Sequence, residues 1–239
     1  MIFSLLLLLG FGQDKTDLYV TAGLGTFRLV PPANILTQYD DGSKKQIGEG
    51  FQNSFYIMEK EITVEQYCRI CKGIFCGRDA CEIQIDQKSP LHSISREDVS
   101  DFLSILNSRE EVVYDLPTTR QQFAASASVL DNIGEWSADG EIYRLLNPLG
   151  WFGFNSGGSL WLGCGRQRNA YGLCDILGNV REWAKEVTYV REEDAEAVKI
   201  CYAYGLTYVS NVSTAPLTKI LGCYERFGDI GFRLIVSSL

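Results

Sequence analysis

Apolar residues at helical spacing, placed behind a capping signal, mark two segments of this chain. Thr63 and Gln66 form a capping box, which predicts a helix that runs to about Lys72. Ser95 and Asp98 form a second box at the same spacing. Behind the second box, one helix face gathers the apolar residues Val99, Phe102, Leu103 and Leu106. Both segments therefore predict short amphipathic helices.

A third helix and several strands complete the predicted elements. Either Thr118 or Thr119 is placed to cap a helix through 123–129. Short apolar stretches predict strands at 18–22, 54–58, 217–221 and 232–236. Between about 131 and 175 the chain is rich in Gly, Asn, Trp and Ser and has little periodicity, which predicts irregular structure. The pattern as a whole predicts an α+β domain with few helices and long loops.

The first residues form a separate apolar block. Residues 2–9 are a continuous apolar run, followed by small and polar residues to Gln13. The run is too short to span a bilayer, which needs about 20 residues. It fits the apolar region of a secretory signal, although a buried first strand is the alternative. We therefore expect a signal peptide at 1–13, a single domain at 14–239, and a secreted or extracytoplasmic protein with no transmembrane span.

Composition narrows the classes of function. The 239 residues include 22 Lys and Arg against 30 Asp and Glu, a formal net charge of −8. A nucleic-acid partner is not expected, because such surfaces need a concentrated positive field. The single histidine, His92, excludes a three-His zinc site and a two-His iron triad. Any Ser-His-Asp mechanism would have to use His92, which precedes a helix cap and is expected to be an ordinary polar residue there.

The segment 169–183 reads N-A-Y-G-L-C-D-I-L-G-N-V-R-E-W. It resembles the signature of the formylglycine-generating enzyme, or sulfatase-modifying factor, family, N-x-(Y/F)-G-L-x-D-M-x-G-N-V-x-E-W, at ten of fifteen positions. Further blocks resemble that family in the same order, at 25–27, 55–67, 89–99, 114–118 and 231–233. The resemblance spans about residues 18–236. It implies a C-type-lectin-like α+β fold with sparse secondary structure and long loops.

The same resemblance implies a structural calcium ion. Carried over by position, its ligands are the side chains of Asp175 and Glu182 and the backbone carbonyls of Gly178 and Val180. These are hard oxygen donors from a short segment, which suits Ca²⁺. The alternative is a loop held by hydrogen bonds alone, with Trp183 filling the core.

The residues that the family's chemistry needs are not found at the matching positions, so we do not expect that chemistry here. Active members oxidise a sulfatase cysteine to formylglycine with copper held by a C-x-x-x-x-C pair, and thiolates are the ligands that select Cu(I). Between Trp183 and Gly231 this chain has only Cys201 and Cys223. Counted back from Gly231 without gaps, the two ligand positions fall near Gly205 and Ser210. The family's iron-dependent members use a histidine cluster, which one histidine cannot supply.

The other cysteines leave alternatives open. Cys68, Cys71, Cys76 and Cys81 have a spacing that a four-cysteine zinc site could use. An exported chain would oxidise them, so we favour disulfides over zinc or free thiols, with Cys71 bonded to Cys76 or Cys81. Eight cysteines allow 105 pairings, so the connectivity is not deducible from sequence.

The C-terminal segment is rich in tyrosine. Tyrosine with Asn, Ser and Gly is typical of adaptable binding surfaces, and the family includes binding proteins whose variable residues lie just before the terminal G-F-R. The candidate ligand-binding residues are Tyr202, Tyr204, Tyr208, Asn211, Tyr224 and Arg226. The alternative is that these tyrosines pack on the core.

Three functions remain in view. We expect an exported, non-catalytic ligand-binding or assembly module that takes a protein or glycan ligand. A structural role in an envelope or secretion complex is a second interpretation. A copper- or iron-dependent oxidase with a rearranged site, which would use Cys201 and Cys223, is the alternative.

Overall fold

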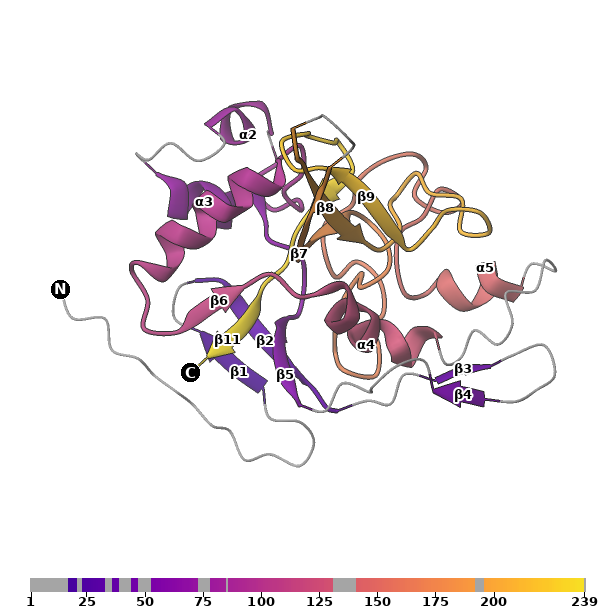
Figure 1. Cartoon of the computed structure of the whole chain (residues 1–239). Coiled ribbons are helices and arrows are strands. Elements are labelled where there is room, and N and C mark those ends of the chain that lie inside the picture. The colour runs from indigo at the N-terminus through magenta and orange to yellow at the C-terminus, as the bar shows by residue number, and fades with distance from the viewer. Residues whose placement is uncertain are drawn as a thin grey trace.

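The computed structural model describes residues 17–20, 23–32, 36–38, 44–46, 53–72, 78–84, 86–130, 141–191 and 196–238. The signal peptide expected at 1–13 lies outside these residues. Two larger sheets organise the described chain (Figure 1). The first has the order β1 (Asp17–Val20), β2 (Gly25–Val30), β5 (Phe55–Met58), β11 (Ile235–Ser238) and β6 (Val113–Asp115). Neighbouring strands in it are antiparallel, so the last strand of the chain pairs between two early ones.

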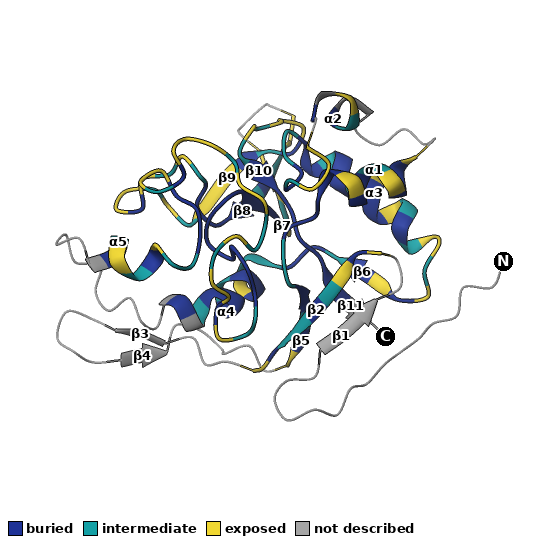
Figure 2. Cartoon of the chain, turned by 180° about the vertical axis from the view of Figure 1, so that it is seen from behind, coloured by how far each residue is buried: buried dark blue, intermediate teal, exposed yellow. Residues whose placement is uncertain are grey.

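The second sheet has the order β10 (Ile230–Gly231), β7 (Arg181–Val190), β8 (Val198–Tyr204) and β9 (Thr218–Gly222). β10 runs parallel to β7, whereas β7, β8 and β9 form an antiparallel meander. Figure 2 shows the exposed β9 at the edge of this sheet beside the more buried β8. A separate hairpin pairs β3 (Leu36–Gln38) with β4 (Lys44–Gln46).

The helices confirm the predicted capping signals. In α1 (Val64–Cys71) and α3 (Arg96–Asn107), Thr63 and Ser95 each complete a full capping box with the residue three positions on. Thr118 rather than Thr119 takes this role for α4 (Thr119–Leu130), because its hydroxyl accepts the Gln121 amide at 3.1 Å. Two short helices, α2 (Arg78–Ile83) and α5 (Glu141–Leu146), were not predicted.

An aromatic cluster joins the helices to the first sheet. Tyr67 of α1 stacks on Phe102 of α3 with ring centroids 5.2 Å apart, and Phe232 meets both rings edge-on. All three side chains are fully buried. Aromatic pairs of this geometry add about 0.5–1.5 kcal/mol each beyond their area burial. The predicted apolar face of α3 is therefore the face that packs in the core.

The disulfide interpretation of the cysteines is confirmed. The structure bonds Cys68 to Cys81, Cys164 to Cys174 and Cys201 to Cys223, and Cys71 is also disulfide-bonded. The zinc alternative is wrong, because two of its four sulfurs bond each other. The suggested Cys71–Cys81 pairing is wrong, since Cys81 of α2 is bonded to Cys68 of α1.

The remaining predictions hold with shifted boundaries. Strands appear at or next to 18–22, 54–58 and 217–221, whereas the strand expected at 232–236 begins only at Ile235. Irregular structure was expected over about 131–175; α5 lies inside that range, whereas residues 147–180 contain only turns, bends and irregular segments. Within the described residues, no helix has the length and apolarity that a membrane crossing requires.

Candidate functional site

A buried ion pair lies between the two sheets. Arg233, just after β10, donates its Nε to both carboxylate oxygens of Glu182 on β7 at 2.8 Å, and its Nη2 lies 2.6 Å from Glu182 Oε1. The other guanidinium donors reach the carbonyls of Met58, Glu59 and Cys174 at 3.1–3.3 Å. Arg233 and Glu182 are 0% and 3% exposed. All three nitrogens of the guanidinium therefore make hydrogen bonds. Through them Arg233 joins the chain segments around residues 58, 174 and 182.

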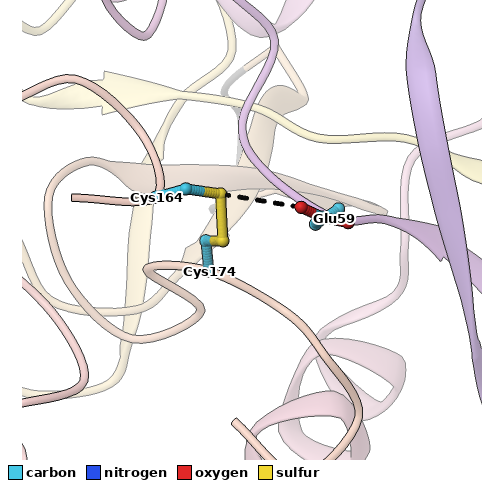
Figure 3. Close-up of side chains that lie close together, drawn as sticks. All are labelled: Glu59, Cys164 and Cys174. Carbon is cyan, nitrogen blue, oxygen red and sulfur yellow. Dashed lines mark hydrogen bonds between the residues drawn. A yellow bond between two sulfur atoms is a disulfide. The ribbon is translucent and has the colours of Figure 1, made fainter. Parts of the chain in front are cut away.

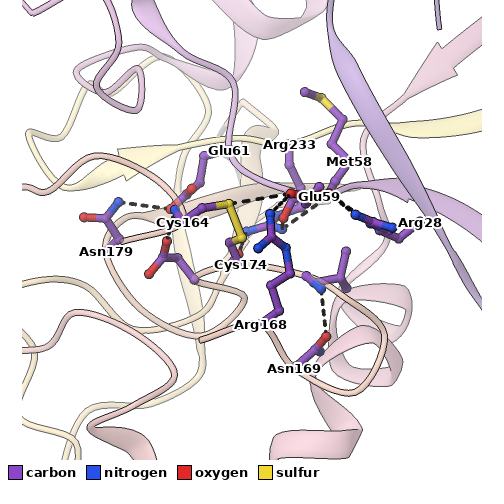
Figure 4. The surroundings of a disulfide bond; sticks show 12 residues. Arg28, Met58, Glu59, Glu61, Cys164, Arg168, Asn169, Cys174, Asn179 and Arg233 are labelled. Carbon is purple, nitrogen blue, oxygen red and sulfur yellow. Dashed lines mark hydrogen bonds and ion pairs between the residues drawn. A yellow bond between two sulfur atoms is a disulfide. The ribbon is translucent and has the colours of Figure 1, made fainter. Parts of the chain in front are cut away.

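Two further carboxylates lie in the same interior. Glu61 and Asp175 are each only 1% exposed. Within the part of the chain that the structure describes, Glu61 Oε2 and Asp175 Oδ1 have no hydrogen-bond partner, while Asp175 Oδ2 accepts the Cys164 amide at 2.8 Å. Glu61 Oε1 accepts the Asn179 side-chain amide at 3.3 Å (Figure 4). Burying a carboxylate oxygen without a partner costs free energy of folding. A proton or a bound cation would reduce that cost in this cluster.

The electrostatics of the cluster agree with that conclusion. Burial, and then the nearby Asp175 charge, raise the pKa of Glu61 well above its ordinary value, against the opposing effect of Arg233. Burial raises the pKa of Asp175 to about 6. Burial also raises the pKa of Glu182, although Arg233 lowers it. Arg233 is the one guanidinium among the described residues in direct contact with this cluster, and Arg166 acts on Asp175 from farther away. Direct contact therefore leaves two negative charges (3 − 1) unbalanced if all three carboxylates are ionised.

The loop that carries Asp175 is tightly turned. Asp175 and Asn179 adopt positive φ angles of 49° and 65°, which non-glycine residues rarely do. A Cβ at Gly178 would lie 2.7 Å from the Trp151 carbonyl, so only glycine fits there. The Asn179 amide is fixed in turn by the Trp161 carbonyl at 3.0 Å. Backbone strain of this kind gathers at ligand sites.

These residues fit the expected calcium ion in part. Asp175 Oδ1 is a buried oxygen without a donor, and a divalent cation would balance the two excess negative charges. Gly178 and Val180 are buried in the same loop, and the use of their carbonyls as calcium ligands stays a prediction. Glu182, however, is already held by Arg233. Glu61 is the residue that sequence reasoning missed, although it stands in the E-I-T block at 61–63 that carried part of the resemblance.

A second group of possible metal ligands lies beside this cluster. Atoms of Glu59, Cys164 and Cys174 lie within 4.8 Å of one another (Figure 3). The two sulfurs are bonded to each other, so neither is a thiolate. Glu59 is paired with Arg28 at 2.6 Å and with Arg168 at 2.5 Å, and these partners outweigh burial and lower its pKa. In this disulfide-bonded form the group is an ion-pair network and not a metal site.

The candidate catalytic residues are also bonded to each other. Cys201 and Cys223 form a disulfide, and both are 0% exposed. His92 is half-buried, and its Nδ1 lies 2.9 Å from the Ser93 hydroxyl. Its backbone is held by the Gln84 side chain, and burial lowers its pKa. His92 thus lies before the cap of α3. Its ring contacts a serine hydroxyl, but no carboxylate among the described residues hydrogen-bonds to the ring as the third member of a triad would.

The structure does not gather the candidate ligand-binding residues into one site. Tyr204 is 3% exposed, and its hydroxyl lies 2.9 Å from that of Ser126, so it packs in the core as the alternative expectation had it. Tyr202 is half-buried, with its hydroxyl 3.1 Å from that of Thr188. Arg226 pairs with the α3 cap residue Asp98 at 2.9 Å. Tyr224 is 73% exposed beyond β9.

Asn211 does line a cavity. A cavity of about 300 Å³ lies between the loop after Gly205 and the loop at 151–156. Its walls are Tyr143, Gly153, Phe154, Val209, Ser210, Asn211 and Val212. The rings of Tyr143 and Phe154 meet edge-on with centroids 5.0 Å apart. Tyr208 hydrogen-bonds through its backbone beside this wall, where its carbonyl accepts the Ser156 hydroxyl.

The sulfatase-modifying factor enzyme 1-like domain model matches residues 29–238. The chain belongs to this family. Among solved structures, it is similar to Treponema denticola variable protein 1, with a TM-score of 0.69, 15% identity, and coverage of 93% of this chain and 99% of that one. PvdO from Pseudomonas aeruginosa gives a TM-score of 0.68 at 16% identity, with coverage of 95% and 100%.

A third solved structure, CarF, gives a TM-score of 0.61 at 17% identity, with coverage of 88% of this chain and 97% of that one. At these identities the likeness establishes the fold alone. In a comparison by sequence with curated proteins, none matches. The expected fold and family are therefore confirmed, and the function must be argued from the residues of this chain.

Proposed function

We propose that this chain is an exported, non-catalytic binding or assembly module built on the sulfatase-modifying factor fold. The observation that carries the proposal is the buried Cys201–Cys223 disulfide. Copper chemistry of the family's kind needs two thiolates. These two sulfurs bind each other instead, in the part of the chain where the family would hold its metal.

The cavity beside Asn211 is the proposed ligand site. Ser210 stands near one of the two positions that the family fills with cysteine, and it lines this cavity. Its hydroxyl is already engaged by the Thr207 amide at 2.9 Å. The exposed Asn211 and the aromatic rings of Tyr143 and Phe154 supply an amide and apolar ring faces. This combination suits a glycan or a peptide segment and needs no redox centre.

Export and calcium complete the proposal. Disulfides persist in oxidising compartments, and the three described here suit a secreted or extracytoplasmic chain. The calcium ion is proposed as structural, held by Asp175 and the loop at 178–182. It would neutralise the excess charge that Glu61 and Asp175 bring into the core.

Two measurements test the proposed function. Fluorescently labelled protein is applied to a glycan microarray and to a peptide array, alongside Phe154→Ala/Asn211→Ala and the control Tyr189→Ala. Tyr189 is 66% exposed at the far end of β7 and lines no part of the cavity. Binding that the double variant loses and the control keeps supports the cavity as the ligand site.

The second measurement follows oxygen uptake by copper-treated protein with a cysteine-containing peptide, before and after mild reduction. We expect no uptake in either state. Oxygen uptake that Cys201→Ser abolishes would establish the oxidase alternative, and wild-type protein that binds neither array would remove the support for a binding module.

A further inference from the structure

A second cavity, of about 380 Å³, opens beside the first turn of α1. Its lining is positively charged, whereas the chain as a whole is negatively charged. Three cationic side chains, Lys60, Arg69 and Lys88, line it against one carboxylate, Glu65. The lining thus carries a formal charge of +2 (3 − 1) in a chain whose net charge is −8. A confined patch of opposite sign to its protein concentrates oppositely charged ligands.

The three cations come from separate parts of the fold. Lys60 follows β5, Arg69 lies in the last turn of α1, and Lys88 lies in the loop before Pro90. Thr63 pairs with Pro90 in an isolated β-bridge, which brings the loop of Lys88 alongside the start of α1. Since long-range pairing is needed to assemble them, the positive patch is a property of the folded protein.

Two of the cations have no ion-pair partner among the residues that the structure describes. Within the described residues, no carboxylate lies within 4.0 Å of the ammonium group of Lys60 or of Lys88. Other lysines of this chain are paired, such as Lys185 with Asp115 at 2.7 Å. The polar groups of Thr63 and Gln66 in the same wall are used by the capping box. The ammonium groups are therefore the available recognition groups.

Two glycines in the wall of this cavity have no side chain that would fill it. A Cβ at Gly163 would contact the Lys60 side chain at 3.6 Å and Glu61 Oε2 at 3.2 Å. Gly23 has a φ of +67°, and a Cβ there would clash with the Arg69 guanidinium. The guanidinium thus lies directly over the Gly23 backbone. Leu162, 48% exposed, forms an apolar wall next to the 44% exposed Trp161.

We propose that this cavity binds a doubly charged tetrahedral oxyanion, a phosphate or sulfate group, between the ammonium groups of Lys60 and Lys88. The two ammonium groups match the two charges of such an anion, and ammonium groups bind it as point charges. Leu162 provides an apolar surface for the group that carries the ester. The site is separate from the cavity beside Asn211, because the two share no lining residue. It does not depend on the proposed binding function.

Isothermal titration calorimetry of the full chain at constant ionic strength tests the proposal. The probes are inorganic phosphate, inorganic sulfate, glucose 6-phosphate and glucose 6-sulfate, with chloride as the reference salt. The site variant is Lys60→Gln/Lys88→Gln. The control, Lys72→Gln/Lys219→Gln, removes the same charge from two exposed lysines outside the cavity. A comparison of the free anions with the esters distinguishes an inorganic ligand from a sugar ester.

We expect one saturable site for at least one of the four probes. The site variant should weaken it by at least about tenfold, because it removes both charge-assisted contacts to the anion. The control should stay within about twofold of wild type. The proposal is overturned if no probe saturates, if the site variant binds like wild type, or if the control loses affinity equally. Circular dichroism of both variants verifies that the loss does not come from unfolding.

Discussion

Replacing Arg233 with methionine is the sharpest test of how this fold is held together. The change keeps much of the side chain's apolar volume but removes all of its donors. Glu182 would lose its contacts at 2.6 and 2.8 Å, and the carbonyls of Met58, Glu59 and Cys174 would lose theirs. The carboxylates that remain are buried, and no other cationic side chain of the described residues forms an ion pair with them.

The expected cost follows from burial. Removing one partner of a buried ion pair costs about 3–5 kcal/mol, because the charge left behind is uncompensated. Arg233 is fully buried and Glu182 nearly so, which places this pair in that class. The exposed pair of Lys185 and Asp115, with side chains 51% and 24% exposed, belongs to the class worth about 0–1 kcal/mol. Lys185→Met is therefore a matched control.

Urea unfolding at pH 7, followed by tryptophan fluorescence under non-reducing conditions, measures both variants. Arg233→Met should lower the free energy of unfolding by about 3–5 kcal/mol, against at most about 1 kcal/mol for Lys185→Met. Adding Glu182→Gln to Arg233→Met should recover part of the loss, since it removes the stranded charge. If Arg233→Met costs no more than Lys185→Met, the cluster is not the stabilising contact that its geometry indicates.

Four further outcomes are expected in melting and urea-unfolding measurements. Chelation with EDTA should lower the melting temperature of the wild type but not of Asp175→Asn; an equal response in both would count against calcium at Asp175. In EDTA, the free energy of unfolding should fall as the pH rises from about 4 through about 6. The reason is that the pKa of Asp175 is about 6 in the folded protein against an ordinary 3.8. Asp175→Asn should flatten this dependence on pH. Cys201→Ser/Cys223→Ser should cost about 3 kcal/mol, from the loop of sequence separation 22 that the disulfide closes; unchanged stability would contradict this. Tyr204→Phe should lower the free energy of unfolding by about 1 kcal/mol, because it removes the hydrogen bond to Ser126. Array binding should be unchanged; a loss of binding would indicate that Tyr204 belongs to the ligand site.

Local signals predicted the local structure. The capping boxes at Thr63 and Ser95 fix where α1 and α3 begin, because the cap and its partner lie three residues apart. β7 was missed, although it is ten residues long. Its first four residues are buried and its last three are exposed, so it shows no regular alternation of apolar and polar positions. A strand that passes from the core to the surface has no single periodic pattern.

Pairings across the chain could not be read from the sequence. The bond between Cys201 and Cys223 depends on β8 and β9 being neighbours, which places Cys201 opposite Leu221. The contact between Glu182 and Arg233 crosses 51 positions. Both residues stood in blocks that resembled the family, at 169–183 and 231–233, but a resemblance identifies blocks and not the contacts between them. Only the fold turns the two blocks into one buried ion pair.

The charge of the buried cluster connects stability with metal binding. Arg233 supplies one positive charge to Glu61, Asp175 and Glu182, so two charges remain for protons or for a divalent cation to balance. The raised pKa of Glu61 favours a proton there, but protons balance both charges only at lower pH, since the pKa of Asp175 is about 6. At neutral pH a calcium ion is the more effective counter-charge. It follows that calcium should stabilise the protein more at pH 7 than at pH 5, and that Arg233→Met, with one more uncompensated charge, should gain more from calcium than the wild type does. A stability gain from calcium that is independent of both pH and Arg233 would place the ion elsewhere.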